Sequence, residues 1–276
     1  MKEKEMQIIQ HLKQYQGILV AFSGGVDSTL LLSLAQEALP GRVLAVTAVS
    51  ETMSRREHQD IEALVRQMKV PHQFLETADL AQPDIAANTR LRCYHCKRYR
   101  FLQMKDLAER LGYDLIVEGS NLDDLNQYRP GYQAVQELGI QSPLLQFGLT
   151  KAMVRDLAKA RGLAVWNKPS APCLATRLPY DTPLTREALA QVDAGEALLR
   201  EYLGETANFR LRSEDGTARL EVDKALFPLL QQEAEGEALQ PALVKGLKDL
   251  GFQNVILDQS GYCSGSYDQR DGERKN

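Results

Sequence analysis

The sequence lacks any apolar segment long enough to cross a membrane. Its best candidate, residues 17–26, reaches Asp27 after ten residues, whereas a membrane span needs roughly 18 uncharged apolar residues. The N-terminal residues mix acidic and basic side chains and contain no apolar core, so we expect neither a signal peptide nor a membrane anchor. These absences predict a cytoplasmic protein.

The sequence also has few cysteines and no excess of basic charge. The 276 residues include 4 cysteines, which are not expected to form disulfides in a reducing compartment, so a metal, catalysis or burial must explain them. With 33 basic and 37 acidic side chains, the formal net charge is −4. Proteins that bind polyanions usually have a basic surface, so this acidic balance disfavours nucleic acid as a partner. A run of five basic residues at positions 90–100 is a local exception, which by itself suggests a solvated helix face.

Apolar runs and helical patterns alternate along the first part of the chain. Strands are predicted at 18–22, 42–49, 72–75 and 115–117, with a fifth near 140–145, and helices at 28–39, 55–68, 97–111 and 150–160. Strands that alternate with helices of this length form βαβ units and hence a parallel sheet. The pattern changes at residues 167–184, which contain four prolines and predict a long ordered loop.

The last third of the chain predicts a smaller α+β domain. A helix is expected at 186–202, strands at 209–211 and 218–222, a helix rich in Leu and Gln, and a last strand at 254–257. The expected organisation is a Rossmann-like α/β domain at 1–166, a proline-rich linker at 167–184 and the α+β domain at 185–276. The polar residues after Tyr267 are expected to fray.

A glycine-rich loop follows the first predicted strand, with the sequence Ser23-Gly24-Gly25-Val26-Asp27-Ser28. Glycine lets the backbone approach a ligand closely, and successive N–H groups at a helix start favour an anion. Ligands of parallel sheets bind at this edge. Because the Lys-Ser/Thr pair of a Walker A loop is absent, γ-phosphate transfer is disfavoured. A carboxylate at Asp27 suits a Mg²⁺ ion that also binds phosphate oxygens.

This hexapeptide resembles the PP-loop of the ATP pyrophosphatase superfamily, whose domains are of the adenine nucleotide alpha hydrolase type. A second segment after the 115–117 strand resembles the superfamily's Gly-x-Asn-x-Asp-Asp motif, with the sequence Glu118-Gly119-Ser120-Asn121-Leu122-Asp123-Asp124. The resemblance implies that the loop holds the pyrophosphate released when a substrate oxygen attacks the α-phosphate of ATP. The implied ATP-binding residues are Ser23, Gly24, Gly25, Asp27, Ser28, Gly119, Asn121 and Asp124.

Further segments resemble the LarE family of sulfur transferases, and this resemblance covers nearly the whole chain. They are Tyr128-Arg129-Pro130-Gly131, Trp166-Asn167-Lys168, Ser170-Ala171-Pro172-Cys173-Leu174-Ala175-Thr176-Arg177, Pro179-Tyr180, Glu196, the Arg210/Arg212 pair and the Arg219/Glu221 pair. The resemblance implies that ATP adenylates a carboxylate of pyridinium-3,5-biscarboxylic acid mononucleotide. Sulfur then displaces AMP, and a second round completes the bisthiocarboxylate precursor of the nickel-pincer cofactor of lactate racemase.

The resemblance also implies roles for individual residues. The expected catalytic residues are Asp27, Cys173 and Glu196. Bidentate arginines suit the substrate's phosphate and carboxylates, and the expected substrate-binding residues are Arg129, Arg177, Arg210 and Arg212. The structural alternatives are an exposed cross-strand pair for the arginines of the small domain and a simple arginine partner for Glu196 and Glu221.

Cys93 and Cys96 depart from the familiar form of that family, in which a single cysteine of the proline-rich loop gives up its own sulfur. They form a C-x₂-C half-site just before a predicted helix. With Cys173 they provide three thiolates, which suit a [4Fe–4S] cluster with one open iron better than a zinc site of four cysteines. The pattern resembles the cluster-containing members of the family and certain tRNA thiolases. The alternatives are a sacrificial Cys173 and zinc, and Cys263 is interpreted as structural.

Three other functions share parts of this pattern. They are a PP-loop tRNA thiolase, an ammonia-dependent amidating synthetase, and a non-catalytic nucleotide or iron–sulfur sensor. The acidic charge balance argues against the first, and the three cysteines argue against the second. The family resemblance also implies a homo-oligomer, either a hexamer or a trimer of dimers, and a separate sulfur source as a partner.

Overall fold

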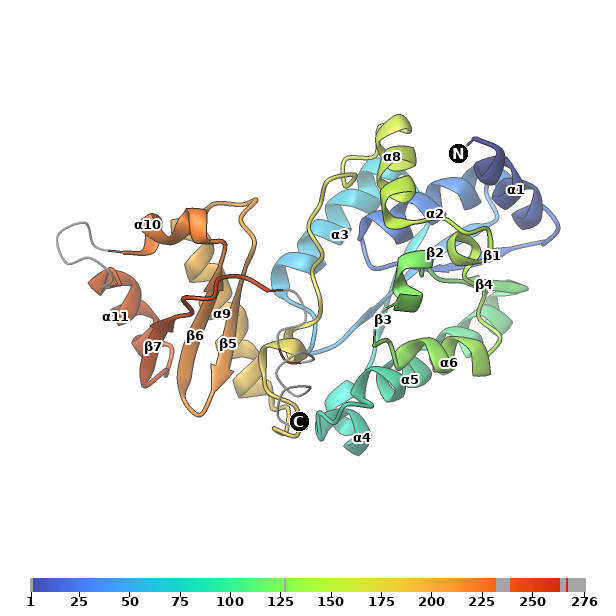
Figure 1. Cartoon of the computed structure of the whole chain (residues 1–276). Helices are drawn as coiled ribbons and strands as arrows, with labels where there is room; N and C mark the ends of the chain where they lie inside the picture. The colour runs from blue at the N-terminus through green and yellow to red at the C-terminus, as the bar shows by residue number, and fades with distance from the viewer. Residues whose placement is uncertain (1, 127, 232–238, 264–266, 268–276) are drawn as a thin grey trace. The chain divides into compact units, whose positions relative to one another are not determined.

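The computed structural model describes residues 2–126, 128–231, 239–263 and 267, and it divides into two compact units (Figure 1). Unit 1 comprises Met1–Asp79 and Arg90–Ala171, and unit 2 comprises Leu80–Thr89 and Pro172–Asn276. The fraying expected after Tyr267 concerns residues outside the described ones. None of the helices in the described part of the chain combines the length and hydrophobicity that crossing a bilayer requires.

Unit 1 is built on a parallel sheet of four strands in the order β3-β2-β1-β4. The strands are β1 (Ile18–Ala21), β2 (Val43–Val49), β3 (His72–Glu76) and β4 (Leu115–Val117). The helices are α1 (Lys2–Leu12), α2 (Val26–Ala38), α3 (Arg55–Met68), α5 (Arg92–Leu111), α6 (Gly131–Glu137), α7 (Pro143–Gln146) and α8 (Lys151–Ala160), with the short 3₁₀ helix η2 at Leu122–Asn126. The predicted α/β class with a parallel sheet is confirmed.

Both faces of this sheet are covered by helices, as Figure 1 shows. Ile18 and Val20 of β1 belong to a core that also contains buried side chains of α1, α2, α3 and α8. Leu19, between them, belongs to a second core with side chains of α5 and α6. Successive side chains of a strand point to opposite faces, so burial on both sides explains the uninterrupted apolar run of β1.

The fifth strand expected near 140–145 is wrong. Gln141 forms an isolated parallel bridge with Val117 of β4, and α7 begins two positions later at Pro143. Proline cannot donate a backbone hydrogen bond, but its fixed φ suits the first turn of a helix. The chain therefore leaves the sheet after one bridge.

Helix α5 begins at Arg92, not at residue 97 as expected. Cys93 and Cys96 consequently lie inside the helix, and the expectation that they precede it is wrong. The first turns of α5 are polar, and its buried apolar side chains begin at Phe101. Hydrophobic periodicity, the main sequence signal of a helix, is therefore missing where the cysteines lie.

Unit 2 contains a mixed sheet in which β5 (Phe209–Glu214) is antiparallel and β7 (Asn254–Leu257) parallel to the central β6 (Thr217–Val222). Its helices are α4 (Pro83–Ala86), α9 (Arg186–Leu203), α10 (Phe227–Leu230) and α11 (Pro241–Asp249), with 3₁₀ helices η3 (Leu174–Arg177) and η4 (Lys224–Leu226). Asp215 and Gly216 have φ of 46° and 74° and form the two-residue turn typical of Asp-Gly hairpins. This tight turn makes β5 and β6 longer than predicted.

A short segment from the first half of the chain, Leu80–Thr89, belongs to unit 2. The N–H of Leu184 donates to the Ala86 carbonyl at 2.7 Å, and the Asn88 amide donates to the Pro179 carbonyl at 2.8 Å. The proline-rich loop is therefore ordered in part by hydrogen bonds to a segment about ninety residues earlier in the chain. No sequence pattern predicted this pairing.

Candidate active site

The glycine-rich loop joins β1 to the start of α2. Gly24 has φ of +67°, and a Cβ placed there would lie 2.7 Å from Cγ1 of Ile61 in α3, so both backbone conformation and space favour glycine. Gly25 is the N-cap of α2 and offers no side-chain cap. A helix start without its own side-chain acceptor is well suited to an anion that accepts from its N–H groups.

Two serine hydroxyls are held at this loop. The Oγ atoms of Ser23 and Ser28 lie 3.1 Å apart, and the Ser28 hydroxyl donates to the Gly25 carbonyl at 3.2 Å. The backbone N–H of Ser23 donates to the Ser28 Oγ at 3.3 Å. The two hydroxyls are therefore held by hydrogen bonds within the loop, where Ser28 is buried.

The second predicted segment lies directly against the loop. A Cβ on Gly119 would be 2.9 Å from the backbone nitrogen of Ser28, so glycine allows β4 and α2 to approach here. The Asn121 amide donates to Asp27 Oδ1 at 3.0 Å, and Lys151 at the start of α8 forms an ion pair with Asp27 Oδ2. Asp124 accepts from the Asn121 N–H at 3.0 Å. The structure thus brings together the residues predicted to bind ATP.

A cavity of about 170 Å³, called here the PP-loop cavity, opens beside the loop. It is lined by residues 23–27, Glu57, residues 168–171 and three basic side chains, Lys151, Arg155 and Lys168. Positive side chains next to a helix N-terminus make a site for a polyanion. The Asp27 carboxylate, at the edge of this cavity, fits Mg²⁺, which commonly takes one or two carboxylates and phosphate oxygens.

Lys151 and Arg155 of the PP-loop cavity were not predicted from the sequence, and Lys168 was named only within the Trp166-Asn167-Lys168 segment of the family resemblance. Arg155 donates to the Trp166 carbonyl at 2.7 Å and to the Lys168 carbonyl at 3.1 Å, so it fixes the segment that carries Lys168. Lys151 and Arg155 are four residues apart at the start of α8 and share one face of that helix. This spacing, after the Thr150 N-cap, was the available signal.

Cys93 and Cys96 lie one helical turn apart in α5, whereas Cys173 is the N-cap of η3 in unit 2. The Cys96 thiol donates to Asp79 Oδ2 at 3.8 Å, and Arg92 approaches the Cys93 sulfur at 3.8 Å. Among the described residues, no three or more His, Cys, Asp or Glu side chains gather as a metal site. The two thiols of α5 fit half of a metal site.

Glu118, the first residue of the second segment, is a buried carboxylate. It accepts hydrogen bonds from the Ser142 hydroxyl at 2.5 Å and the Ser120 hydroxyl at 2.9 Å, and it pairs with Lys97 at 3.2 Å. Burial raises the pKa of Glu118, but the positive charge of Lys97 and these donors outweigh burial and hold the pKa below its usual value. Glu118 is therefore ionised. Its oxygens accept hydrogen bonds from neighbouring residues of the protein, and these bonds order the loop.

In unit 2, the predicted catalytic Glu196 forms a bidentate ion pair with Arg177, at 2.8 Å to Nε and 2.9 Å to Nη2. Burial raises the pKa of Glu196, but the adjacent Arg177 lowers it below its usual value. Arg210 stacks over the Tyr262 ring at 5.2 Å. Burial and the positive charge of Arg177 lower the pKa of Arg210.

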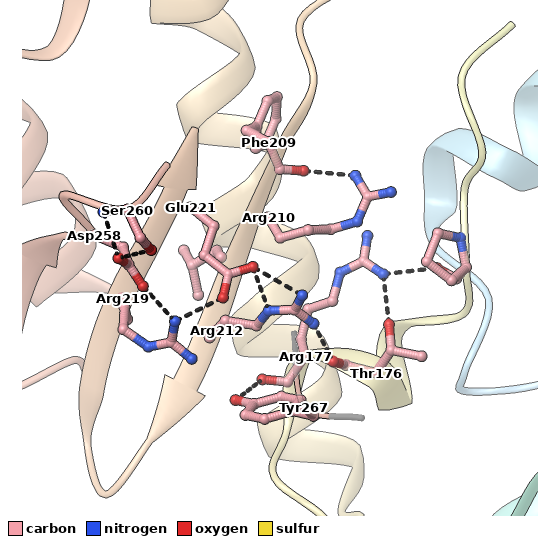
Figure 2. A network of polar contacts seen from close by, with 12 residues as sticks. Thr176, Arg177, Phe209, Arg210, Arg212, Arg219, Glu221, Asp258, Ser260 and Tyr267 are labelled. Atoms are coloured by element: carbon pink, nitrogen blue, oxygen red, sulfur yellow. Dashed lines mark hydrogen bonds and ion pairs between the residues drawn. The ribbon is translucent and has the colours of Figure 1, made fainter. Parts of the chain in front are cut away.

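The neighbouring arginines form a buried network with carboxylates, shown in Figure 2. Arg212 donates to Glu221 at 2.9 Å and to the Thr176 carbonyl at 2.5 Å, while Arg219 pairs with Glu221 at 2.6 Å and Asp258 at 2.7 Å. The Tyr267 ring lies 4.9 Å from the Arg212 guanidinium. Because Arg212 is buried, the alternative of an exposed cross-strand pair is excluded for it. Its role in substrate binding stays a prediction.

Comparison with known proteins gives a matching family model and several relatives. A family model described as a PP-loop domain matches residues 1–129. The chain is 38% identical over 262 residues to an uncharacterized protein of Synechocystis sp., with 93% of this chain and 95% of the relative covered. It is 34% identical over 264 residues to the pyridinium-3,5-bisthiocarboxylic acid mononucleotide synthase of Lactiplantibacillus plantarum, with 95% and 92% covered.

A match to a tRNA-specific 2-thiouridylase of Prochlorococcus marinus is shorter. Identity is 31% over 122 residues, which cover 38% of this chain and 30% of that enzyme. The match to the synthase, in contrast, spans both units, as does the match to the Synechocystis protein. The chain therefore belongs to the LarE family, that of the pyridinium-3,5-bisthiocarboxylic acid mononucleotide synthase.

Proposed function

We propose that this protein uses ATP to activate the carboxylates of pyridinium-3,5-biscarboxylic acid mononucleotide and transfers sulfur to them. The observation that carries this proposal is the basic PP-loop cavity, in a chain that is 34% identical over 95% of its length to a synthase of the bisthiocarboxylate. The products would be the thiocarboxylate, AMP and pyrophosphate.

The chemistry of the PP-loop cavity supports the first step. A carboxylate is a poor electrophile, and adenylation gives it a good leaving group. In the substrate, a carboxylate oxygen attacks the α-phosphorus of ATP, and the bond to the pyrophosphate oxygen breaks. The backbone N–H groups of the loop with Lys151, Arg155 and Lys168 would stabilise the negative charge that develops on the leaving pyrophosphate. A Mg²⁺ ion bound by Asp27 would neutralise phosphate charge.

For the sulfur supply we propose a [4Fe–4S] cluster held by Cys93, Cys96 and Cys173. The one-turn spacing of the first two thiols in α5 supports this assignment, and three thiolates would leave one iron open to a sulfide ligand. Anaerobic reconstitution followed by iron and sulfide analysis tests it. About four irons per chain, lost in Cys→Ser variants, is expected, and fewer than two irons, or one zinc instead, contradicts it.

The decisive experiment combines the protein with ATP, Mg²⁺, the biscarboxylate mononucleotide and sulfide under anaerobic conditions. Pyrophosphate release that depends on the mononucleotide, together with a thiocarboxylate product identified by mass spectrometry, is expected. The mass of the protein is measured in the same sample, because loss of one H₂S would identify Cys173 as a sacrificial donor. ATP binding without substrate-dependent pyrophosphate release would overturn the proposal and favour a sensor.

The same assay separates the other candidate enzymes. An ammonia-dependent synthetase would form an amide from ammonium and would not need the cysteines. A tRNA thiolase would bind tRNA with an affinity that falls steeply with salt and would thiolate it. The hexamer or trimer of dimers implied by the family resemblance stays a prediction, which light scattering on the purified protein tests.

A further inference from the structure

A second cavity of about 160 Å³, called here the α5–α6 cavity, lies in unit 1. It is enclosed by the first turns of α5, by η2 and by the start of α6. It shares the 118–124 segment with the PP-loop region, because Ser120 and Asp124 line it, whereas Gly119 and Asn121 contact the loop. The 118–124 segment therefore lines the α5–α6 cavity and also contacts the PP-loop.

The walls of the α5–α6 cavity are largely apolar and aromatic. They include Leu125, Tyr128, Tyr132 and Leu145. Gly131 determines how closely α6 approaches α5, because a Cβ there would lie 2.9 Å from Cδ of Lys97 and 3.0 Å from the Cys93 carbonyl. A flat ring with apolar faces suits such walls, since aromatic pairs favour stacked or edge-to-face contact.

Two basic side chains add charge to these walls. Lys97 pairs with Glu118 at 3.2 Å, and Arg129 pairs with Asp124 at 2.8 Å while its side chain remains 52% exposed. The Arg90 guanidinium lies 5.7 Å from the centre of the Tyr128 ring. Glu118 also accepts hydrogen bonds from the Ser120 and Ser142 hydroxyls. Its negative charge is therefore stabilised by these hydroxyls as well as by Lys97. Cations near one apolar cavity select a ligand that carries carboxylates.

We propose that the α5–α6 cavity binds the dicarboxylated pyridinium ring of the acceptor. The inference rests on the proposed function and adds the place where the acceptor ring is recognised. The ring lies against Tyr128, one carboxylate faces Arg129 and Lys97, and the other is directed along the 118–124 segment toward the PP-loop cavity. Cys93 is one of the residues that line the same cavity.

Binding of pyridine-3,5-dicarboxylate to the full-length protein without ATP tests this assignment, with ligand-observed NMR or calorimetry as the measurement. Arg129→Gln and Tyr128→Leu are expected to weaken binding about tenfold, because each removes one charged or ring contact. Tyr128→Phe keeps the ring and is expected to bind like the wild type. Matched controls are Arg110→Gln and Tyr94→Leu, which change α5 side chains outside the cavity, and they are expected to stay within twofold of wild type.

A kinetic arm measures the acceptor KM and the ATP affinity of the same variants. A KM for the mononucleotide raised about tenfold, with ATP affinity unchanged, supports the proposal. Equal binding of the dicarboxylate by the wild type, Arg129→Gln and Tyr128→Leu, or no binding by the wild type, overturns it even if the enzyme makes thiocarboxylate. If the cavity variants lose binding but no thiocarboxylate forms, the cavity assignment stands and the proposed function fails.

Discussion

The two units of this protein use basic side chains in opposite ways. In unit 1, Lys151, Arg155 and Lys168 line an open cavity beside the start of α2. In unit 2, Arg177, Arg212 and Arg219 are buried, and each pairs with at least one carboxylate. A buried charge must be paired to be tolerated, whereas a cation beside a cavity can exchange its partner for a ligand. An arginine in a family motif is therefore not by itself evidence of ligand binding.

The largest effect should come from breaking the buried network of unit 2. Glu221 is 1% exposed and pairs with both Arg212 and Arg219. Glu221→Gln therefore removes the negative charge that compensates these two buried arginines. We expect a loss of about 3–5 kcal/mol in unfolding free energy by urea denaturation. The control is Glu62→Gln, whose exposed i,i+4 pair with Arg66 should cost less than about 0.5 kcal/mol. Equal losses would remove the distinction between the units.

A second test concerns the backbone of the PP-loop. Gly24→Ala adds strain at φ of +67° and a contact at 2.7 Å with Ile61, whereas Gly41→Ala adds strain at φ of +76° with nothing within 4 Å. We expect losses of about 2–3 kcal/mol for Gly24→Ala and about 1 kcal/mol for Gly41→Ala. ATP affinity should fall in the Gly24 variant alone. Indistinguishable stabilities would mean that Ile61 moves aside freely.

The third test asks whether the cavity cations act on a ligand and not on stability. Lys151→Met should weaken ATP binding by about 10- to 100-fold, because a charged hydrogen bond contributes about 1.5–3 kcal/mol. Unfolding free energy should change little. Lys159→Met in the same helix is the control, since Lys159 lies over Trp166 and does not line the cavity. Unchanged ATP affinity in Lys151→Met would place the nucleotide elsewhere.

The smallest expected effect depends on pH. Burial raises the pKa of Asp258, but the Ser260 hydroxyl and Arg219 outweigh it and lower the pKa from 3.8 to about 2. A depressed pKa means that the carboxylate stabilises the fold above its unfolded pKa, and that this contribution is lost as the pH falls through the folded value. Asp258→Asn should therefore cost roughly 1 kcal/mol at neutral pH.

The difference between wild type and Asp258→Asn should shrink as the pH is lowered from about 4 to about 2. Urea denaturation at several pH values measures it. Asp249→Asn, which removes an exposed i,i+4 pair with Lys245, is the control and should leave the stability unchanged within the error of the measurement. A difference that stays constant down to low pH would contradict the depressed pKa.

The features of the fold that depend on local sequence were predictable. Strands β1 and β4 are continuous apolar runs and β2 is interrupted only by Thr47, and the loop between β1 and α2 carries its chemistry in six consecutive residues. The start of α5 was not predictable from periodicity, because its first turns are polar and are held by partners such as Glu118 and Asp79. Nor was the length of β5, where Arg212 and Glu214 have the polar character of a loop but are paired inside the unit.

The candidate active site shows the same difference between features set by local sequence and features set by distant residues. The PP-loop and the 118–124 segment were identified because their glycines and carboxylates follow strands directly. Lys151, Arg155 and Lys168 come from a later helix and loop, and only folding brings them to the cavity. The pairing of Glu196 with Arg177 joins residues 19 positions apart, and sequence could suggest it only as one alternative to catalysis.

The assignment of Leu80–Thr89 to unit 2 has a consequence for synthesis of the chain. Ile85 is 1% exposed, and the Asn88 amide donates to the carbonyl of Pro179, which is 91 positions later in the chain. At about 5–20 residues per second, this segment leaves the ribosome roughly 5–18 s before its partner exists. The nascent chain must therefore carry Ile85 without its final surroundings while unit 1 is being completed, and a protein truncated at residue 171 would permanently lack the Pro179 partner of Asn88.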